Sequence, residues 1–337
     1  MELQMAGRDT APLPAAAATV GSLLEVRDLG VSFATKEGRA QVVTGLNYSI
    51  GEGETLGIVG ESGCGKTMTS LSLMGLVPPG GRVTGEIRFG GRNLVDQSAR
   101  DWRSLRGRDI AMIFQEPMTA MNPVMTVGRQ IAEVLTVHEG LSTASAFDRA
   151  VELLEAVGIP SPNQRARDYP HQLSGGMRQR AMIAMALACK PKLLVADEPT
   201  TALDVTIQAQ ILDLILELQE DTGMSVQFIT HNLAVVSELA HRILVMYAGR
   251  GVENAPAEKI FDNPLHPYTR GLIATLPDPD RKVDQLFVIP GSLRIQPQRG
   301  CRFASRCSLA SEICAATEPP MLEVETDHFV ACHKVTP

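Results

Sequence analysis

The chain has 337 residues, of which 44% are hydrophobic and 20% are charged, and its formal net charge is −7. This length allows about two domains of roughly 150 residues, or one large domain with an appendage, and the composition is typical of a soluble globular protein. The acidic balance argues against general nucleic-acid binding, which needs a basic face. No apolar run approaches the ~18 residues typical of a membrane span, and no signal peptide is expected.

The first third of the chain predicts two long strands followed by a strand and a helix. Residues 1–20, with their prolines and alanines, are expected to form a disordered tail. Apolar residues at roughly alternate positions predict a strand from Leu24 to Phe33, and Gln41–Ile50 predicts a second. The short apolar run Thr55–Val59 leads into glycines, and Met68–Leu76 is predicted to be helical.

The middle of the chain predicts alternating helices and strands after a segment, residues 100–158, that mixes helix and loop. These elements are the helix Gly175–Ala188, the strand Leu193–Ala196, the helix Ile207–Gln219, and the strands Val226–Thr230 and Ile243–Tyr247. This alternation indicates an α/β domain with a largely parallel core sheet. Beyond about Asn263 prolines recur and cysteines gather, so we expect a small accessory domain there.

A glycine-rich loop predicts a nucleotide site. Residues 60–67, Gly-Glu-Ser-Gly-Cys-Gly-Lys-Thr, fit the pattern G-x-x-x-x-G-K-[ST] between an apolar strand and a predicted helix. Glycines let backbone N–H groups turn toward a phosphate, and the helix directs its positive end to the same anion. Lys66 is expected to reach the β- and γ-phosphates and Thr67 to ligate Mg²⁺. The alternative is a chance glycine-rich turn. The loop follows an apolar strand and opens a predicted helix, which is the context that phosphate binding requires and that a chance turn does not.

Two adjacent carboxylates end a later apolar strand. Asp197 is expected to hold Mg²⁺, and Glu198 is expected to act as general base or to orient water on the γ-phosphate. The alternative is a polar strand terminus. A solvated surface explains two carboxylates at the end of an apolar strand poorly.

A second anion-binding helix start lies between these motifs. Residues 173–180, Leu-Ser-Gly-Gly-Met-Arg-Gln-Arg, place Ser174, Gly175 and Gly176 at the start of a helix. The pattern resembles the signature motif of ABC ATPases, with which one subunit closes over the ATP held by another. Met177 stands where that family usually has glutamine, which removes at most one side-chain hydrogen bond.

Further positions match the family in order. Phe33 resembles the aromatic residue that stacks on adenine, and Gln115 resembles the glutamine that contacts Mg²⁺ and senses the γ-phosphate. Asp204, in Ala-Leu-Asp, resembles the dimer-crossing loop, and His231 resembles the switch histidine. A core aromatic and a structural histidine are the alternatives for Phe33 and His231. The resemblance also implies nucleotide contacts along the loop by Gly60, Ser62, Gly63, Cys64, Gly65, Lys66, Thr67 and Met68.

The C-terminal part narrows the resemblance. The run Asn-Pro-Leu-His-Pro-Tyr-Thr at residues 263–269 is similar to the C-terminal region of di- and oligopeptide importer ATPases, and the Met-bearing signature resembles their D-type subunit. The resemblance implies an ABC ATPase domain over residues 21–262, with an antiparallel β subdomain and a helical subdomain at about 116–180. An accessory domain would cover residues 263–337.

Four of the six cysteines form the pattern C-x5-C-x6-C-x17-C, and without a secretion signal they suggest a reducing compartment. These are Cys301, Cys307, Cys314 and Cys332. Four thiolates can ligate an iron–sulfur cluster or Zn²⁺, and the same cysteines could instead form disulfides or stay free thiols. The family resemblance implies a [4Fe–4S] cluster. His333 is a possible alternative ligand. Cys189 is expected to pack in the core, and Cys64 is expected to be a small side chain tolerated in the phosphate loop, with sensitivity to oxidation as the alternative.

The resemblance therefore implies an ATPase subunit that powers a peptide importer, peripheral on the cytoplasmic face of the cell membrane. The resemblance implies a second, similar ATPase, two membrane subunits and an extracytoplasmic binding protein as partners, and no nucleic acid. Alternatives are an importer for nickel or another small solute, a soluble ABC ATPase without a transport role, and a redox-sensing module whose ATPase is secondary.

Overall fold

A computed structural model describes residues 21–116, 120–200, 204–276, 288–291 and 299–335. The predicted N-terminal tail, and Ala202 and Leu203 of the dimer-crossing motif, lie outside the described residues. Among the described residues, no helix combines the length and the apolar character needed to cross a bilayer.

A four-stranded antiparallel sheet is built from the first part of the chain, with strand order β2-β1-β4-β5. Its strands are β1 (Ser22–Thr35), β2 (Gly38–Gly51), β4 (Gly81–Phe89) and β5 (Arg92–Asn93). A tight turn joins β1 to β2, and Thr35 pairs with Gly38 next to it. The two long strands predicted from alternating apolar residues are confirmed, and they form the antiparallel β subdomain that the resemblance implied.

An eight-stranded sheet forms the centre, with strand order β11-β12-β10-β9-β3-β8-β7-β6. Its strands are β3 (Thr55–Val59), β6 (Ile110–Ile113), β7 (Leu193–Asp197), β8 (Ser225–Thr230), β9 (Arg242–Tyr247), β10 (Arg250–Pro256), β11 (Leu322–Glu325) and β12 (His328–Val330). The five strands from β9 to β6 run parallel, and β10, β12 and β11 extend the sheet in antiparallel order. The largely parallel core is confirmed, and the C-terminal segment adds its own two strands to the same sheet.

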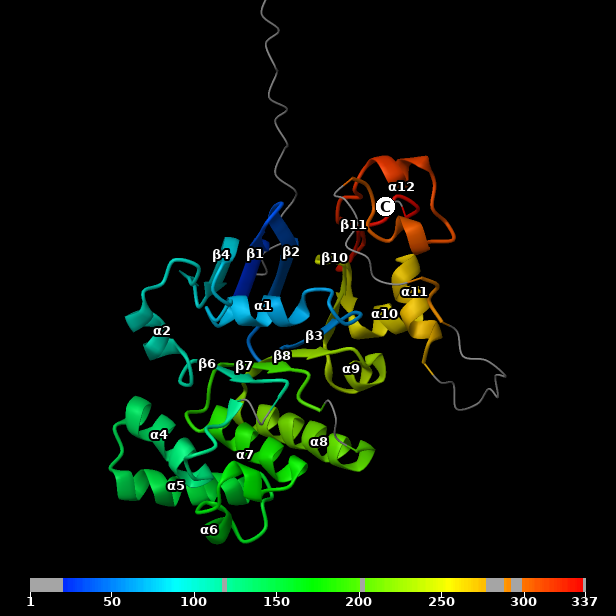
Figure 1. Ribbon diagram of the computed structural model, residues 1–337. Coiled ribbons are helices and arrows are strands. Elements are labelled where there is room, and N and C mark those ends of the chain that lie inside the picture. The colour runs from blue at the N-terminus through cyan, green and yellow to red at the C-terminus, as the bar shows by residue number, and fades with distance from the viewer. Residues whose placement is uncertain (1–20, 117–119, 201–203, 277–287, 292–298, 336–337) are drawn as a thin grey trace, which may run out of the picture.

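Helices cover both faces of the parallel strands (Figure 1). They are α1 (Lys66–Leu73), α2 (Ala99–Leu105), α4 (Val127–Glu139), α5 (Thr143–Ala156), α6 (Pro162–Arg165), α7 (Gly175–Leu187), α8 (Val205–Thr222), α9 (Leu233–Leu239), α10 (Ala257–Asp262), α11 (Pro267–Ala274) and α12 (Glu312–Ala316). Helix α1 lies between the two sheets, and α4, α5, α7 and α8 lie on the opposite face (Figure 1).

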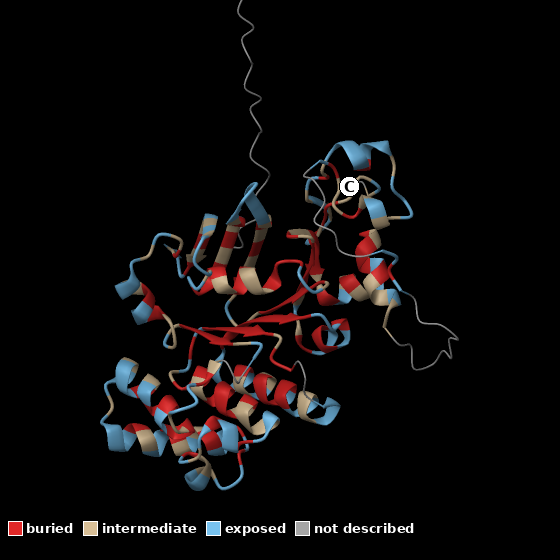
Figure 2. Ribbon diagram, in the orientation of Figure 1, coloured by how far each residue is buried: buried red, intermediate tan, exposed pale blue. Residues whose placement is uncertain are grey.

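The parallel strands are buried on both faces, which explains their continuous apolar runs (Figure 2). Along β7, Leu194 and Ala196 pack in the core shared with α7 and α8. Leu193 and Val195 pack in the core between the two sheets, which includes residues of α1. Because side chains alternate along a strand, one short segment joins both cores and so fixes the position of the carboxylates at its end.

Two predicted helix boundaries move for local reasons. Helix α1 begins at Lys66 and ends at Leu73, earlier than predicted, because Gly75 adopts a φ of 58°. A Cβ at Gly75 would lie 2.4 Å from the Trp102 ring, so this turn also requires glycine for space. Helix α8 begins earlier than predicted, because Asp204 caps it by accepting a hydrogen bond from the Ile207 N–H at 2.9 Å.

A buried polar network fastens the C-terminal segment to the central sheet. Glu253 of β10 has no exposed surface, and its carboxylate accepts the N–H groups of Leu265 and His266 at 2.8 and 3.0 Å. His328 of β12, also fully buried, places Nε2 2.8 Å from the same carboxylate. The Nδ1 atom of His266 accepts the Tyr268 N–H at 3.0 Å and so caps α11. The His-Pro-Tyr run therefore has a structural role in starting this helix.

Substituting His266 by asparagine is expected to flatten the fall of stability between pH 6.5 and 4. Burial lowers the pKa of His266 to about 4, whereas the unfolded value is about 6.5. As the pH falls, His266 is therefore protonated in the unfolded chain before it is protonated in the folded chain. The contribution of the neutral His266 to the free energy of unfolding is fully present above about pH 6.5 and is lost as the pH drops toward 4. This one group accounts for about 3 kcal/mol over that range. Asparagine keeps a capping oxygen but does not titrate.

Denaturant unfolding of the wild type and of His266→Asn at several pH values checks this expectation. The exposed His171, which stacks on Tyr169, gives a matched control as His171→Asn. Parallel pH curves for the wild type and His266→Asn would contradict the expectation.

Candidate functional site

Four neighbouring parallel strands bring the predicted site residues to one edge of the sheet. The strand order β3-β8-β7-β6 places the ends of these strands side by side. The glycine loop follows β3, His231 follows β8, Glu198 follows β7 and Gln115 lies two residues beyond β6. Parallel strands have their carboxyl ends at the same edge, where ligands of open α/β sheets bind. Residues from four distant parts of the sequence therefore meet.

The phosphate loop wraps around its own lysine. The side chain of Lys66 is 5% exposed, and its ammonium donates to the carbonyl oxygens of Gly60 at 2.7 Å and Glu61 at 3.2 Å. Gly65, with a φ of 106°, forms the N-cap of α1, so the first N–H groups of the helix face the loop. The arrangement is that of an anion site, with a buried cation at the start of a helix.

Gly60 is required by close packing. A Cβ at this position would lie 2.2 Å from the Met246 carbonyl oxygen and 2.8 Å from the Cys64 sulfur. Cys64 is itself fully buried and packs in the core between the sheets. Ser62 and Gly63 are exposed, and Met68 is half-buried.

Asp197 and Thr67 form the oxygen pair expected of a Mg²⁺ site. The Thr67 hydroxyl donates to Asp197 Oδ1 at 3.3 Å, and Asp197 is 1% exposed. Burial raises the pKa of Asp197 to about 6, and the neighbouring Glu198 adds to that rise. A carboxylate and a hydroxyl side by side offer the hard oxygen ligands that Mg²⁺ prefers. These two residues therefore fit the ion chemically.

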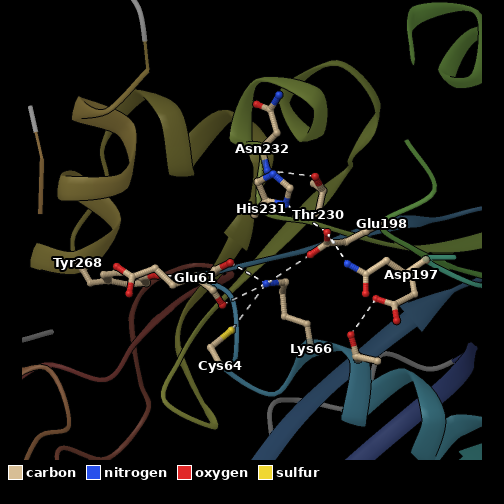
Figure 3. Close-up of polar contacts among 12 residues, drawn as sticks. Glu61, Cys64, Lys66, Asp197, Glu198, Thr230, His231, Asn232 and Tyr268 are labelled. Carbon is tan, nitrogen blue, oxygen red and sulfur yellow. Dashed lines mark hydrogen bonds and ion pairs between the residues drawn. The ribbon is translucent and has the colours of Figure 1, made fainter. Parts of the chain in front are cut away.

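Glu198 is the centre of the polar contacts at this edge (Figure 3). Its Oε2 atom accepts a hydrogen bond from Gln115 Nε2 at 3.1 Å and lies 3.3 Å from His231 Nδ1. Its Oε1 atom lies 4.0 Å from Lys66 Nζ. Its backbone has a φ of 47°, in the left-handed region that non-glycine residues seldom occupy. Such strain concentrates at functional sites, because the surrounding structure must hold it.

The turn after β8 positions His231. Asn232 donates its backbone N–H to the Thr230 hydroxyl at 3.0 Å and caps α9 by accepting the Ala234 N–H at 3.0 Å. The His231 side chain is 58% exposed, so it is not a buried structural histidine. It therefore stands at the open side of Glu198.

The signature residues lie apart from the phosphate loop and form a second hollow. Ser174 caps α7 by accepting the Met177 N–H at 3.3 Å. A Cβ at Gly175 would meet no atom within 4 Å, so this end of the helix is open. Ser174, Gly175, Gly176 and Asp204 line a hollow of about 460 Å³. The chain thus presents two helix N-termini of the kind that bind anions, one at the phosphate loop and one at the signature, and it does not bring them together itself.

Phe33 lies on β1 in the antiparallel sheet, half-buried against the core between the sheets. A Cβ at Gly81, its partner on β4, would lie 3.0 Å from the Phe33 ring. Its adenine-stacking role stays a prediction.

Two residues at the phosphate loop were missed from the sequence. The Tyr268 hydroxyl accepts the Glu61 N–H at 2.9 Å (Figure 3), and Arg306 Nη1 lies 2.8 Å from Glu61 Oε2. Tyr268 belongs to the His-Pro-Tyr run, which in the sequence indicated only the family resemblance. No sequence signal linked either residue to the loop.

The four C-terminal cysteines are free thiols in one small segment. Cys301 donates its backbone N–H to the Cys314 carbonyl at 2.7 Å, which closes a loop between them. Among the described residues, no group of three or more His, Cys, Asp or Glu side chains is arranged to hold a metal ion. The [4Fe–4S] cluster that the family resemblance implied therefore stays a prediction. Cys189, also free, is half-buried next to helix α7.

Two family models match the chain. The model described as ABC transporter matches residues 43–201, which include the phosphate loop, the signature and the paired carboxylates. The model described as oligopeptide/dipeptide transporter, C-terminal region, matches residues 252–314. The second match covers Glu253, the His-Pro-Tyr run and three of the four cysteines.

Similar proteins cover nearly the whole chain. The oligopeptide transport ATP-binding protein of Bacillus subtilis is 52% identical over 92% of this chain and 88% of its own length. The dipeptide transport ATP-binding protein of Lactococcus lactis is 50% identical over 91% of this chain and 89% of its own length. Among solved structures, the dimeric ATP-binding cassette MJ0796 bound to ADP and Pi superposes with a TM-score of 0.63 at 27% identity, covering 69% of this chain and 98% of that one. The chain belongs to the ABC transporter family and is an ATP-binding subunit of its oligopeptide/dipeptide branch.

Proposed function

We propose that this chain hydrolyses ATP to drive the import of dipeptides or oligopeptides from the cytoplasmic face of a cell membrane. One observation carries the catalytic part: Lys66, Gln115 and His231 all converge on the Glu198 carboxylate at the edge where the phosphate loop lies. The peptide substrate is supported by relatives at about half identity whose names state peptide transport.

Each residue at this edge has one task in the proposed reaction, and Phe33 contributes from the antiparallel sheet. Lys66 and the loop amides bind the β- and γ-phosphates, and Phe33 stacks on the adenine. Thr67, Asp197 and Gln115 would hold Mg²⁺, which would neutralise part of the phosphate charge when bound. Glu198 takes a proton from the attacking water, and His231 contacts the γ-phosphate from the open side.

The hollow lined by Ser174, Gly175, Gly176 and Asp204 supports a site completed between two subunits. An open helix N-terminus at a distance from the chain's own phosphate loop suits the triphosphate held by a neighbour. We infer a second, similar ATPase as that neighbour. Two membrane subunits, contacted by a helical subdomain at about residues 116–180, and an extracytoplasmic binding protein complete the transporter. The proposed ATPase domain covers residues 21–262 and the accessory domain residues 263–337.

Uptake of a labelled tripeptide by cells lacking this gene tests the transport function. Complementation with the wild type is expected to restore uptake, and Glu198→Gln is expected not to. Restored nickel uptake with unchanged peptide uptake would favour the small-solute alternative. Unchanged uptake of both would favour a soluble ATPase without a transport role.

We further propose that Cys301, Cys307, Cys314 and Cys332 hold a [4Fe–4S] cluster, with Zn²⁺ as the alternative. The support is chemical: four free thiols occur in one segment, and burial raises the pKa of Cys301 to about 11 with a further rise from the other three cysteines. A metal ion that binds thiols displaces their protons to solvent, so metal binding ionises thiols whose raised pKa otherwise keeps them protonated. The cluster would then stabilise a segment that has little core of its own.

Anaerobic purification of the full chain distinguishes the two metals. A cluster predicts brown protein with absorbance near ~400 nm and about four irons per chain. Colourless protein with stoichiometric zinc would contradict the cluster. Loss of the bound metal, whether iron or zinc, in Cys314→Ser but not in Cys189→Ser would link the metal to the C-terminal cysteines.

A further inference from the structure

Glu61 places a carboxylate in the loop that is proposed to bind phosphate. It is the second residue of the glycine loop, and its side chain is 26% exposed. A negative charge there opposes the charge of a triphosphate. The loop needs either a cation beside Glu61 or a geometry that turns the carboxylate away.

Arg306 supplies the cation from the C-terminal segment, 245 residues further along the chain. Its Nη1 atom lies 2.8 Å from Glu61 Oε2, and its side chain is only 6% exposed. A charge-assisted pair this close and this shielded is screened much less than a surface pair.

The guanidinium of Arg306 is held in place independently of Glu61. Its Nε atom donates to the Pro290 carbonyl at 2.8 Å, and its Nη1 atom lies 3.4 Å from the Tyr247 hydroxyl. Its Cζ atom lies 5.7 and 5.9 Å from the ring centres of Tyr247 and Phe303. These contacts orient the guanidinium without any contribution from Glu61.

A second contact fixes the backbone of the same residue. The Tyr268 hydroxyl accepts the Glu61 N–H at 2.9 Å, and Tyr268 has no exposed surface. Its ring packs edge-on against Tyr247 at 4.7 Å and beside Phe303 at 5.4 Å. Strand β9, helix α11 and the C-terminal segment thereby share one aromatic cluster directly behind the phosphate loop.

We propose that Arg306 and Tyr268 are positioning residues for ATP: Arg306 offsets the charge of Glu61, and Tyr268 fixes its backbone, so the C-terminal segment completes the phosphate loop. The proposal rests on ATP binding at this loop. It assigns to the C-terminal segment a direct part in nucleotide affinity, beyond any docking or metal-holding role.

A charge cycle on the full chain tests this proposal, with the KM for MgATP and kcat measured for the wild type, Arg306→Gln, Glu61→Gln and the double variant. Arg306→Gln is expected to raise the KM about tenfold and to change kcat less than about twofold, because a shielded charge compensation is lost. In the Glu61→Gln background, the same change is expected to shift the KM less than about threefold. Arg306→Lys should restore part of the affinity, since it keeps the charge but not the fork of donors.

Two further variants separate loop positioning from loose docking of the C-terminal segment. Tyr268→Phe removes only the hydroxyl and is expected to raise the KM about fivefold. Asp327→Asn weakens another contact of the segment with β9, the 3.9 Å pair with Arg242, and is expected to leave the KM unchanged. Equal KM shifts for Arg306→Gln with and without Glu61, or an equal shift for Asp327→Asn, would overturn the proposal. A wild type that does not hydrolyse ATP would instead overturn the proposed function.

Discussion

Replacing Glu198 by glutamine is expected to lower the rate of ATP hydrolysis by a factor of about 10²–10⁴ while ATP binding persists. Glutamine has nearly the same shape, so the loop, Thr67 and Asp197 keep their places. It cannot accept a proton from water, and its amide cannot pair with the Lys66 ammonium as the carboxylate does at 4.0 Å. Binding and turnover should therefore separate in this variant.

The same variant is expected to accumulate a closed dimer with ATP. In the proposed dimer, the signature of one subunit would close over the triphosphate held by the other, and hydrolysis would reopen the pair. Size-exclusion chromatography with and without MgATP measures this state, and phosphate release measures turnover. A matched control is Glu155→Gln, an exposed change on α5 away from the edge. Hydrolysis at the wild-type rate by Glu198→Gln would show that the catalytic role belongs to another residue.

The parts of the site that are local in sequence could be predicted from it. The phosphate loop joins a strand to a helix within a few residues, and Asp197 and Glu198 directly follow a strand, so spacing alone indicates their chemistry. The meeting of Gln115, Glu198 and His231 is also predictable, because parallel strands end at one edge. Their pairwise contacts depend on the order β8-β7-β6, which no local pattern specifies.

The contacts that escaped prediction join residues far apart in the chain. Glu61 meets Tyr268 and Arg306 across 207 and 245 residues, and neither partner belongs to a periodic or spaced motif that points to the loop. Residues 322–330 carried no strand prediction, since the alternation there is short, and they form strands by pairing with one another and with β10. Pairing with distant strands, rather than local sequence preference, determines the secondary structure of such segments. The cysteine spacing likewise indicates candidate ligands but not where their side chains point.

Replacing Glu253 by alanine is expected to lower the free energy of unfolding by about 3–5 kcal/mol, because one buried carboxylate serves three partners. The N–H groups of Leu265 and His266 and the imidazole of His328 would lose their acceptor, and His328 already has an unpartnered Nδ1 atom among the described residues. Each buried donor left without a partner costs about 1–3 kcal/mol. The loss should concentrate where α11 and β12 meet β10.

Limited proteolysis and hydrogen exchange can locate that loss, with cleavage in the C-terminal segment expected well before the ATPase core opens. Glu325→Ala is the matched control: it removes a carboxylate of β11 that pairs with Lys259 at 3.7 Å, is 47% exposed, and should cost at most about 1 kcal/mol. Similar unfolding of both variants would contradict the role of the buried network. Because His266 lies two residues before Tyr268, release of this segment should also free the Glu61 N–H. Glu253→Ala is therefore expected to weaken ATP binding from a position outside the nucleotide site, while Glu325→Ala should not.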